Sequence, residues 1–354
     1  MDQKKLAALR AKYADAPAGE VYDAQFKKVV ELLFSGLDRR YKPYEGVSSL
    51  LDAPLLLDAA SRDDFGGLDL ALIGVPMDLG ITNRPGCRFG PRAVRDIERV
   101  GPYHHVHRLV PSAEIKLADV GDVPFRSRFS LADSHQDIEA YFVKAAAANV
   151  ATLAVGGDHS ISLPILKALG RGRPPGKPLG MLHIDAHCDT GGPFEGSKFH
   201  HGGPFREAVL AGVLDPERTI QIGIRGSAEY LWEFSFDSGM TVIHAEELAA
   251  MGAARAIERI RAVLGDGPAY LSFDIDSLDP GFAPGTGTPE VGGLSPREAM
   301  ALIRGAGGLD FVGGDVVEVA PQYDANTNTA HIAAQMLFEI LCVLTIARKQ
   351  RLGT

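Results

Sequence analysis

The 354-residue chain is predicted to form a single three-layer α/β/α sandwich around a parallel sheet. Two observations lead to this fold class. Strand-like apolar runs alternate with helical stretches along most of the chain, and such alternation places parallel strands side by side with helices on both faces. The composition is 45% hydrophobic, which supplies a large core, and α/β folds of this length often form one domain.

Seven strand-like runs and the helices between them make up the predicted sandwich. The runs cover 68–75, 151–155, 180–184, 219–224, 240–243, 269–273 and 311–319. Helical stretches lie at 138–149 and 296–303. Ser295 is expected to cap the second of these, because Pro296 and Glu298 follow it in a pattern typical of a helix start.

Residues 1–65 differ from the rest of the chain. Two amphipathic helices are predicted there, over 4–13 and 23–37, followed by an irregular tract. We expect an N-terminal helical arm over 1–65 and an α/β domain over 66–354. The arm either packs on a neighbouring subunit or forms an extension that packs on its own chain.

Charge and cysteine content restrict the function. The chain has 36 basic and 45 acidic residues, and a net charge of −9 disfavours nucleic acid and suits a small cationic substrate. Cys87, Cys188 and Cys342 are few, odd in number and scattered, which predicts no disulfide framework and a reducing cytoplasm. The apolar stretch 332–347 contains Gln335 and Glu339, so we expect a buried terminal helix and no membrane contact.

Three clusters of acidic residues and histidines each follow an apolar run. They are Asp158-His159, the Asp-Ala-His-Cys-Asp segment at 185–189, and Asp274-Ile275-Asp276. Side chains two positions apart on a strand point to one side, and parallel sheets place ligands at the carboxyl ends of their strands. Carboxylates gathered in a buried place cost several kcal/mol each unless a cation compensates them.

The residue types predict divalent metal. Imidazoles and carboxylates without aligned thiolates favour ions such as Mn²⁺, tolerate Ni²⁺, Co²⁺ or Fe²⁺, and argue against a cysteine-rich structural zinc. Two ions about 3.5 Å apart would hold and acidify a water between them.

Five ordered motifs resemble those of the ureohydrolase family, the arginase and agmatinase group. They read Gly-Gly-Asp-His-Ser at 156–160, His-Ile-Asp-Ala-His-Cys-Asp-Thr at 183–190, His-Gly-Gly-Pro-Phe at 201–205, Ser-Phe-Asp-Ile-Asp-Ser-Leu-Asp-Pro at 272–280 and Asp-Val-Val-Glu-Val-Ala-Pro at 315–321. The loop at 84–92 also resembles the family's early glycine and arginine loop. The agmatinase-like branch is the most similar. The resemblance implies an arginase-like sheet and hydrolysis of a guanidino C–N bond with release of urea.

The resemblance also implies roles for individual residues. One metal would be bound by His159, Asp185, Asp189 and Asp274, and the other by Asp185, His187, Asp274 and Asp276. Two divalent ions per subunit are therefore expected, with Mn²⁺ favoured and Ni²⁺ an alternative. Glu318 would bind the guanidinium group, His201 would shuttle protons, and Asp189 would hold the proton of the attacking water and deliver it to the departing amine.

One departure from the family pattern affects the substrate. Agmatinase-like members usually carry threonine where this chain has Gly203, and a second histidine, His200, precedes His201. We expect an altered pocket wall, with agmatine as the leading substrate. Guanidine, guanidinobutyrate, and an alkylguanidine or biguanide are the alternatives.

Three further expectations concern partners and function class. The arm and the resemblance together imply a homo-oligomer, a trimer or hexamer. A catalytically silent partner subunit of a hetero-oligomer, or a related metal-dependent deacylase, is the alternative from another class. The complete set of ligand residues argues against the first, and Glu318 with the paired aspartates against the second.

Four other groups of residues have expected structural roles. His104, His105 and His107 have no acidic neighbour in sequence and are assigned to packing or surface. His183 is expected to be a core histidine or a donor to a ligand. His200 would compete with His201 for its role, and Trp232 would pack in the core or form a pocket wall.

Overall fold

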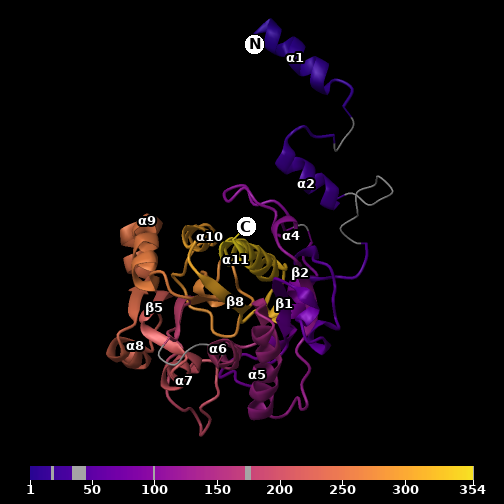
Figure 1. The fold of residues 1–354 in the computed structure, drawn as a ribbon. Helices are drawn as coiled ribbons and strands as arrows, with labels where there is room; N and C mark the ends of the chain where they lie inside the picture. The colour runs from indigo at the N-terminus through magenta and orange to yellow at the C-terminus, as the bar shows by residue number, and fades with distance from the viewer. Residues whose placement is uncertain (17–19, 34–44, 99, 172–176, 354) are drawn as a thin grey trace.

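A parallel eight-stranded sheet forms the centre of the molecule (Figure 1). The computed structural model describes residues 1–16, 20–33, 45–98, 100–171 and 177–353. The strand order is β2-β1-β3-β8-β7-β4-β5-β6, and every neighbouring pair is parallel. The strands are β1 Leu70–Val75, β2 Leu117–Asp122, β3 Ala151–Gly156, β4 Leu179–Ile184, β5 Leu214–Ile224, β6 Thr241–His244, β7 Ala269–Asp274 and β8 Phe311–Val317.

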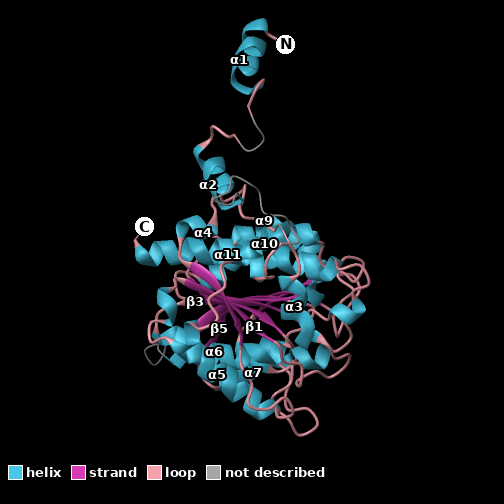
Figure 2. Cartoon of the chain, turned by 90° about the vertical axis from the view of Figure 1, so that its right-hand side faces the viewer, coloured by secondary structure: helices cyan, strands magenta, loops and turns pink. Residues whose placement is uncertain are grey.

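Helices cover both faces of this sheet (Figure 2). On one face α3 Gly90–Arg95, α9 Ala245–Leu264, α10 Pro296–Gly305 and α11 Asn328–Leu352 share one hydrophobic core with the strands. On the other, α5 Leu131–Ala147, α6 Ser162–Arg171 and α7 Pro204–Leu210 share a second core. The short helices α4 Pro111–Glu114 and α8 Glu233–Ser238 complete the layers. The predicted single-domain three-layer sandwich is confirmed.

All seven predicted strands are present, but the sequence pattern missed β2. This edge strand carries Asp119 and Asp122, and acidic residues are depleted in strands. Arg95 of α3 pairs with both, at 2.8 Å from Asp119 and 2.6 Å from Asp122. The predicted cap of α10 is present, because Ser295 Oγ accepts from the Glu298 amide at 3.3 Å while the Glu298 carboxylate accepts from the Ser295 amide at 2.9 Å.

The N-terminal segment contains the two predicted helices, but the apolar residues of the first do not gather on one face, so the expectation that it is amphipathic was wrong. The first, α1 Gln3–Tyr13, stands apart from the sandwich in both views and buries none of its residues, so it shows no buried apolar face within this chain. The second, α2 Ala24–Leu33, contacts the body where Gln25 Nε2 donates to the Arg108 carbonyl at 3.1 Å. Residues 34–37 of the predicted helix 23–37 lie outside the described residues. The boundary at 65 stays a prediction.

The terminal helix α11 is longer than the predicted apolar stretch 332–347. Among the described residues it is the one helix long and apolar enough to cross a membrane, by length and composition only. Of its most apolar 18-residue window, 78% is buried inside the fold. Its partners include β8 and α10, so it is a core helix, as expected.

Candidate metal centre and active site

The predicted site residues meet at the carboxyl ends of four neighbouring strands, β3, β8, β7 and β4. Asp158 and His159 follow β3, Asp274 ends β7, and the 185–189 segment follows β4. The turn after β3 requires glycine, because a Cβ on Gly157 would lie 1.8 Å from the Met77 carbonyl oxygen. Asp158 serves this turn by accepting from the Gly80 and Ser160 amides, at 2.8 and 2.9 Å.

One imidazole nitrogen is surrounded by three carboxylates. His159 Nδ1 lies 2.9 Å from Asp189 Oδ2, 3.1 Å from Asp185 Oδ2 and 3.2 Å from Asp274 Oδ2. This nitrogen is buried and has no hydrogen-bond partner. Burial alone would lower the pKa of His159, but the three carboxylates next to Nδ1 raise it well above its ordinary value. The cluster therefore demands a positive charge at this point.

The hydrogen bond at the second ring nitrogen of His159, Nε2, shows which nitrogen is free to bind a cation. Its Nε2 lies 2.8 Å from Ser272 Oγ, and Ser272 donates its own hydrogen to Asp315 Oδ1 at 2.7 Å. The serine oxygen therefore accepts from His159 Nε2, which leaves Nδ1 with a lone pair facing the carboxylates. This is the arrangement a metal-ligating histidine requires.

A second group of possible metal ligands lies around His187. Its Nδ1 is 3.2 Å from Asp276 Oδ2 and 3.5 Å from Asp185 Oδ1. The two oxygens of Asp185 thus lie next to different imidazoles, Oδ2 near His159 and Oδ1 near His187. Asp185 therefore connects the group around His159 with the group around His187. Burial, followed by the charges of Asp276 and Asp185, raises the pKa of Asp274 well above its ordinary value. This excess of buried negative charge fits a pair of divalent cations.

The two groups together contain the six residues expected to bind metal. They comprise four aspartates and two histidines, and all but the half-buried His187 are at most 8% exposed. The predicted division of these residues between two ions stays a prediction.

The three residues with predicted catalytic roles lie beside this cluster. His201 Nδ1 is 2.9 Å from Glu318 Oε1, which also accepts from the His159 amide at 2.9 Å. Glu318 Oε2 is buried and has no hydrogen-bond partner, so one acceptor oxygen remains free. Burial would lower the pKa of His201, but the Glu318 carboxylate raises it to about 9.

Two of these side chains sit on strained backbone. Asp189 has φ 52° and Glu318 has φ 64°, in the left-handed region that non-glycine residues rarely adopt. Such conformations cost about 1 to 3 kcal/mol each and cluster at functional sites. Nothing in the sequence indicated this strain. Thr82 was also missed, although its Oγ1 lies 2.6 Å from His201 Nε2.

A cavity of 150 Å³ opens onto the cluster. The predicted site residues in its lining are His187, Asp189, His201, Asp274 and Asp276, and the wall includes Thr82, Arg225, Leu231, Trp232, Thr288 and Glu290. A larger cavity of 780 Å³ lies between α2 and α11, and none of the predicted site residues lines it.

Arg225 is the only arginine or lysine among the described residues that line the smaller cavity. Its guanidinium group is fully engaged by backbone carbonyl oxygens. These belong to Gly223, Asp276, Ser277, Leu278, Glu290 and Val291, at 2.7 to 3.3 Å. Arg225 therefore joins the end of β5 to the segments 276–278 and 290–291, and has no donor left for a ligand.

Comparison with known proteins identifies the family. The model of the Arginase family matches residues 68–343. The chain belongs to the arginase family.

Its relatives support an agmatinase-like branch within the arginase family. A guanidinopropionase of Pseudomonas aeruginosa is 46% identical over 85% of this chain and 92% of its own length. A mitochondrial agmatinase of Gallus gallus is 45% identical over 84% of this chain and 86% of its own. The solved structure of proclavaminate amidino hydrolase from Streptomyces clavuligerus superposes with a TM-score of 0.80 at 35% identity, over 87% of this chain and 100% of that one. The chain is a ureohydrolase, a hydrolase of linear amidine C–N bonds.

The departure at Gly203, which was expected to alter the pocket wall of this ureohydrolase, leaves no open space beside that residue. A Cβ there would lie 2.9 Å from both His200 Nε2 and the Gly191 carbonyl oxygen. The His200 ring therefore occupies the space next to Gly203, and its Nε2 bonds the Gly192 carbonyl oxygen at 2.8 Å. His200 is not in the lining of the cavity, so it does not take the position of His201.

The other histidines and the tryptophan are also placed. His104 is buried, as its expected packing role requires. The expectation that no carboxylate lies near it was wrong, because the fold brings Glu339 to 2.7 Å from its Nε2. Trp232 is half-buried and lines the cavity, so it forms part of the pocket wall and does not pack in the core. His183 Nε2 lies 2.7 Å from Asp185 Oδ2.

Proposed function

We propose that this arginase-family protein is a two-metal hydrolase that cleaves the guanidino C–N bond of a small guanidino compound and releases urea, with an agmatine-type substrate favoured. The observation that carries the proposal is the convergence of four aspartates and two histidines beside the free Glu318 Oε2. The names of its relatives, a guanidinopropionase and an agmatinase, support a guanidino substrate.

Six residues would hold the two metals. His159, Asp185, Asp189 and Asp274 would bind one ion, and Asp185, His187, Asp274 and Asp276 the other. Mn²⁺ is favoured and Ni²⁺ is the alternative. When bound, the ions would supply an acidified water able to attack the guanidinium carbon, which resonance makes unreactive toward neutral water.

The protein's own groups would orient the substrate and move protons. Glu318 would accept a charge-assisted hydrogen bond from the guanidinium group at Oε2, because Oε1 is already occupied by His201 and the His159 amide. Asp189 lines the cavity and would pass a proton to the departing amine. His201 would exchange protons at Nε2, where Thr82 holds its ring in place.

The walls of the cavity favour a substrate without a carboxylate. Arg225 has no free donor, so the described lining residues offer no available arginine or lysine to an anionic tail of a substrate. Such a tail would also lie near the Glu290 carboxylate. A cationic tail, as in agmatine, or a short uncharged one avoids this cost. Guanidine, an alkylguanidine or a biguanide therefore remain alternatives. Guanidinobutyrate also remains one, since the relatives include a guanidinopropionase and a guanidinobutyrase, and it tests this argument directly.

Urea release across a panel of guanidino compounds tests the proposal. The purified protein is loaded separately with Mn²⁺ and Ni²⁺, and its metal content is measured in the same samples. We expect urea from agmatine or a shorter guanidine, and little from arginine or guanidinobutyrate. Acetate release from acetylated amines without urea would indicate a deacylase, and no activity with any compound would favour a silent partner subunit.

We further propose that the chain forms a homo-oligomer, a trimer or hexamer. All residues of α1 are unburied in the single chain, and a neighbouring subunit would cover them. Light scattering that gives the mass of one 37.8 kDa chain would contradict this proposal. Mass spectrometry of the complex isolated from its source would detect a second kind of subunit. A cytoplasmic location stays our expectation, since the three cysteines are free and buried.

A further inference from the structure

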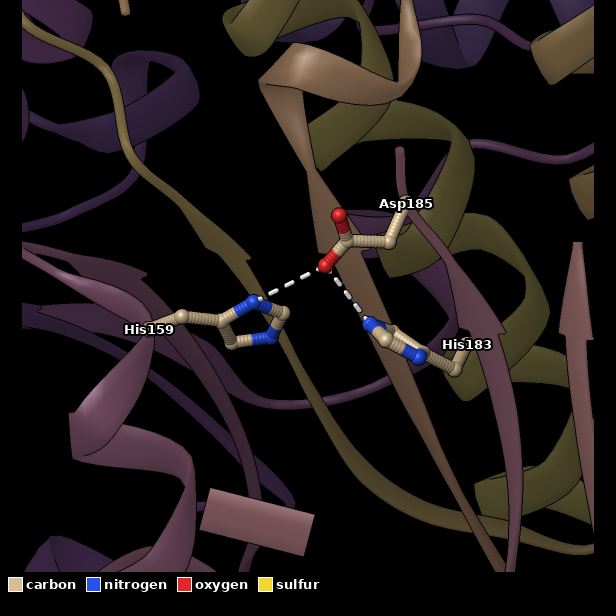
Figure 3. A group of neighbouring side chains, drawn as sticks. All are labelled: His159, His183 and Asp185. Atoms are coloured by element: carbon tan, nitrogen blue, oxygen red, sulfur yellow. Dashed lines mark hydrogen bonds and ion pairs between the residues drawn. The ribbon is translucent and has the colours of Figure 1, made fainter. Parts of the chain in front are cut away.

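His183 is the one buried histidine of the site whose role the mechanism leaves undecided. It precedes Asp185 by two positions, is fully buried, and its Nε2 lies 2.7 Å from Asp185 Oδ2 (Figure 3). Together with His159 and Asp185 it forms a group whose donor atoms lie within 4.8 Å of one another, close enough to share an ion. His183 is therefore either a metal ligand or a donor that orients Asp185. The location of its proton decides between these roles.

Gln221 determines where that proton is. This residue is the register partner of His183 on the adjacent strand β5 and is also fully buried. Its Nε2 lies 2.6 Å from the Cys188 carbonyl oxygen and 3.0 Å from His183 Nδ1. A carbonyl oxygen only accepts, so the amide must turn its NH₂ group toward both. His183 Nδ1 then accepts, and its Nε2 carries the proton.

We propose that Gln221 and His183 are a positioning pair that holds Asp185 across the two metal positions. The protonated Nε2 donates to Asp185 Oδ2, the oxygen that faces His159. The His187 amide donates to Asp185 Oδ1 at 2.6 Å, on the side of the second metal position. Each oxygen is thus fixed by one donor and keeps a lone pair for one ion. The proposal rests on the proposed function only in taking Asp185 as a metal ligand.

The same glutamine also positions the loop that carries the next ligand. Its bond to the Cys188 carbonyl fixes the peptide that precedes Asp189, whose φ of 52° needs such support. Without Gln221, the His183 ring loses the contact at Nδ1 that holds it in place, and the Cys188 peptide loses its donor. The hydrogen bond from His183 Nε2 to Asp185 Oδ2 would then be weaker.

Manganese titration of the metal-free, full-length protein tests the pair through affinity and stoichiometry, without reference to activity. Groups that orient a metal-binding carboxylate typically contribute ten- to a hundredfold to affinity. We expect His183→Leu and Gln221→Leu to weaken Mn²⁺ binding by about this factor. The control is Thr219→Val on the same strand, which removes a 2.7 Å bond from a buried side chain to the Asp215 carbonyl and should leave affinity unchanged.

The variant His183→Gln separates the two roles of His183. A glutamine amide nitrogen reaches the place of the imidazole Nε2 and donates, but it does not supply a lone pair to an ion. If His183 positions Asp185, His183→Gln binds two ions with affinity close to that of the wild type. Weakening equal to that of His183→Leu would overturn the proposal and make His183 a ligand.

Two further outcomes are decisive. Wild-type affinity in Gln221→Leu would show that the glutamine has no positioning role. If His183→Leu does not fold, as judged by its circular dichroism, Gln221→Leu and His183→Gln carry the test. Failure to release urea from any guanidino compound would count against the proposed function and leave these titrations valid.

Discussion

The Nδ1 atom of His201 lies 2.9 Å from Oε1 of Glu318. The histidine proposed to carry protons is therefore hydrogen-bonded to the glutamate proposed to bind the substrate's guanidinium group. The two residues are 117 positions apart in the sequence. Burial would lower the pKa of His201, but the Glu318 carboxylate raises it to about 9, and Glu318 Oε2 has no hydrogen-bond partner.

This contact predicts coupled effects of substitution on catalysis. Glu318→Gln loses one charge-assisted bond to the guanidinium and should lower kcat/KM by about ten- to a hundredfold, equivalent to roughly 1.5 to 3 kcal/mol. His201→Asn should lower kcat. The double variant should lose less than the product of the single losses, because each residue supports the other. Steady-state kinetics on the best substrate would show this, with metal content measured as the control. Native kinetics in Glu318→Gln would remove its assigned role.

Asp274 is the residue whose loss should empty the metal centre. Its carboxylate lies 3.2 Å from His159 Nδ1, and we assign it to both ions. Asp274→Ala should abolish urea release and reduce bound metal to one or none per subunit, as measured by mass spectrometry of the metal in dialysed protein. The exposed Asp63 gives the matched control, since Asp63→Ala should keep two ions. A full complement of metal in Asp274→Ala would contradict the shared-ligand assignment.

Arg225 should stabilise the floor of the cavity through its carbonyl contacts. Removal of the side chain in Arg225→Met leaves several buried carbonyl oxygens without donors, and we expect a loss of about 3 kcal/mol in the free energy of unfolding. Urea denaturation would measure it. Arg297→Met, on the exposed side of α10, should change stability by less than about 0.5 kcal/mol. Equal stability of the two variants would show that the contacts contribute little.

A buried carboxylate away from the site predicts how stability depends on pH. Glu339 accepts from Arg304 at 2.6 Å and lies 2.7 Å from His104. Burial would raise the pKa of Glu339, but hydrogen bonds from His104 and Arg304 lower it from 4.5 to about 2. A folded-state pKa below the unfolded value stabilises the fold above about pH 4.5, and this contribution is lost as the pH falls from 4.5 toward 2.

The variant Glu339→Gln isolates this contribution. At pH 6 it should be less stable than the wild type by on the order of 3 kcal/mol, and the difference should shrink steadily at pH 4 and pH 3. Chemical denaturation at these three values measures it. A difference that stays constant with pH would mean that the ionised form of Glu339 does not stabilise the fold.

Residue patterns in the sequence were sufficient to predict the fold class and the candidate metal residues. The cluster at 185–189 and the pair Asp274 and Asp276 follow apolar strands, and the carboxyl ends of parallel strands meet at one edge. The expected strand alternation does not place these side chains, however: residues 185–189 lie beyond β4, which ends at Ile184, and Asp276 lies in the turn Ile275–Ser277. The strand β2 was missed because Asp119 and Asp122 make its sequence unlike a strand. Arg95 of α3 compensates their charges, and this contact between separate elements is not visible in the local sequence pattern.

The tertiary structure alone decided which groups outside the motifs act on those residues. Gln221 lies next to His183 only because β5 pairs with β4, and Glu339 reaches His104 across 235 positions. Arg225 reaches carbonyl oxygens of loops far along the chain. The position of a proton, the saturation of a guanidinium and the strain at Asp189 and Glu318 all depend on neighbours brought close by packing. Local periodicity contains no information about such neighbours, because hydrogen bonds act over about 3 Å in space whatever the separation along the chain.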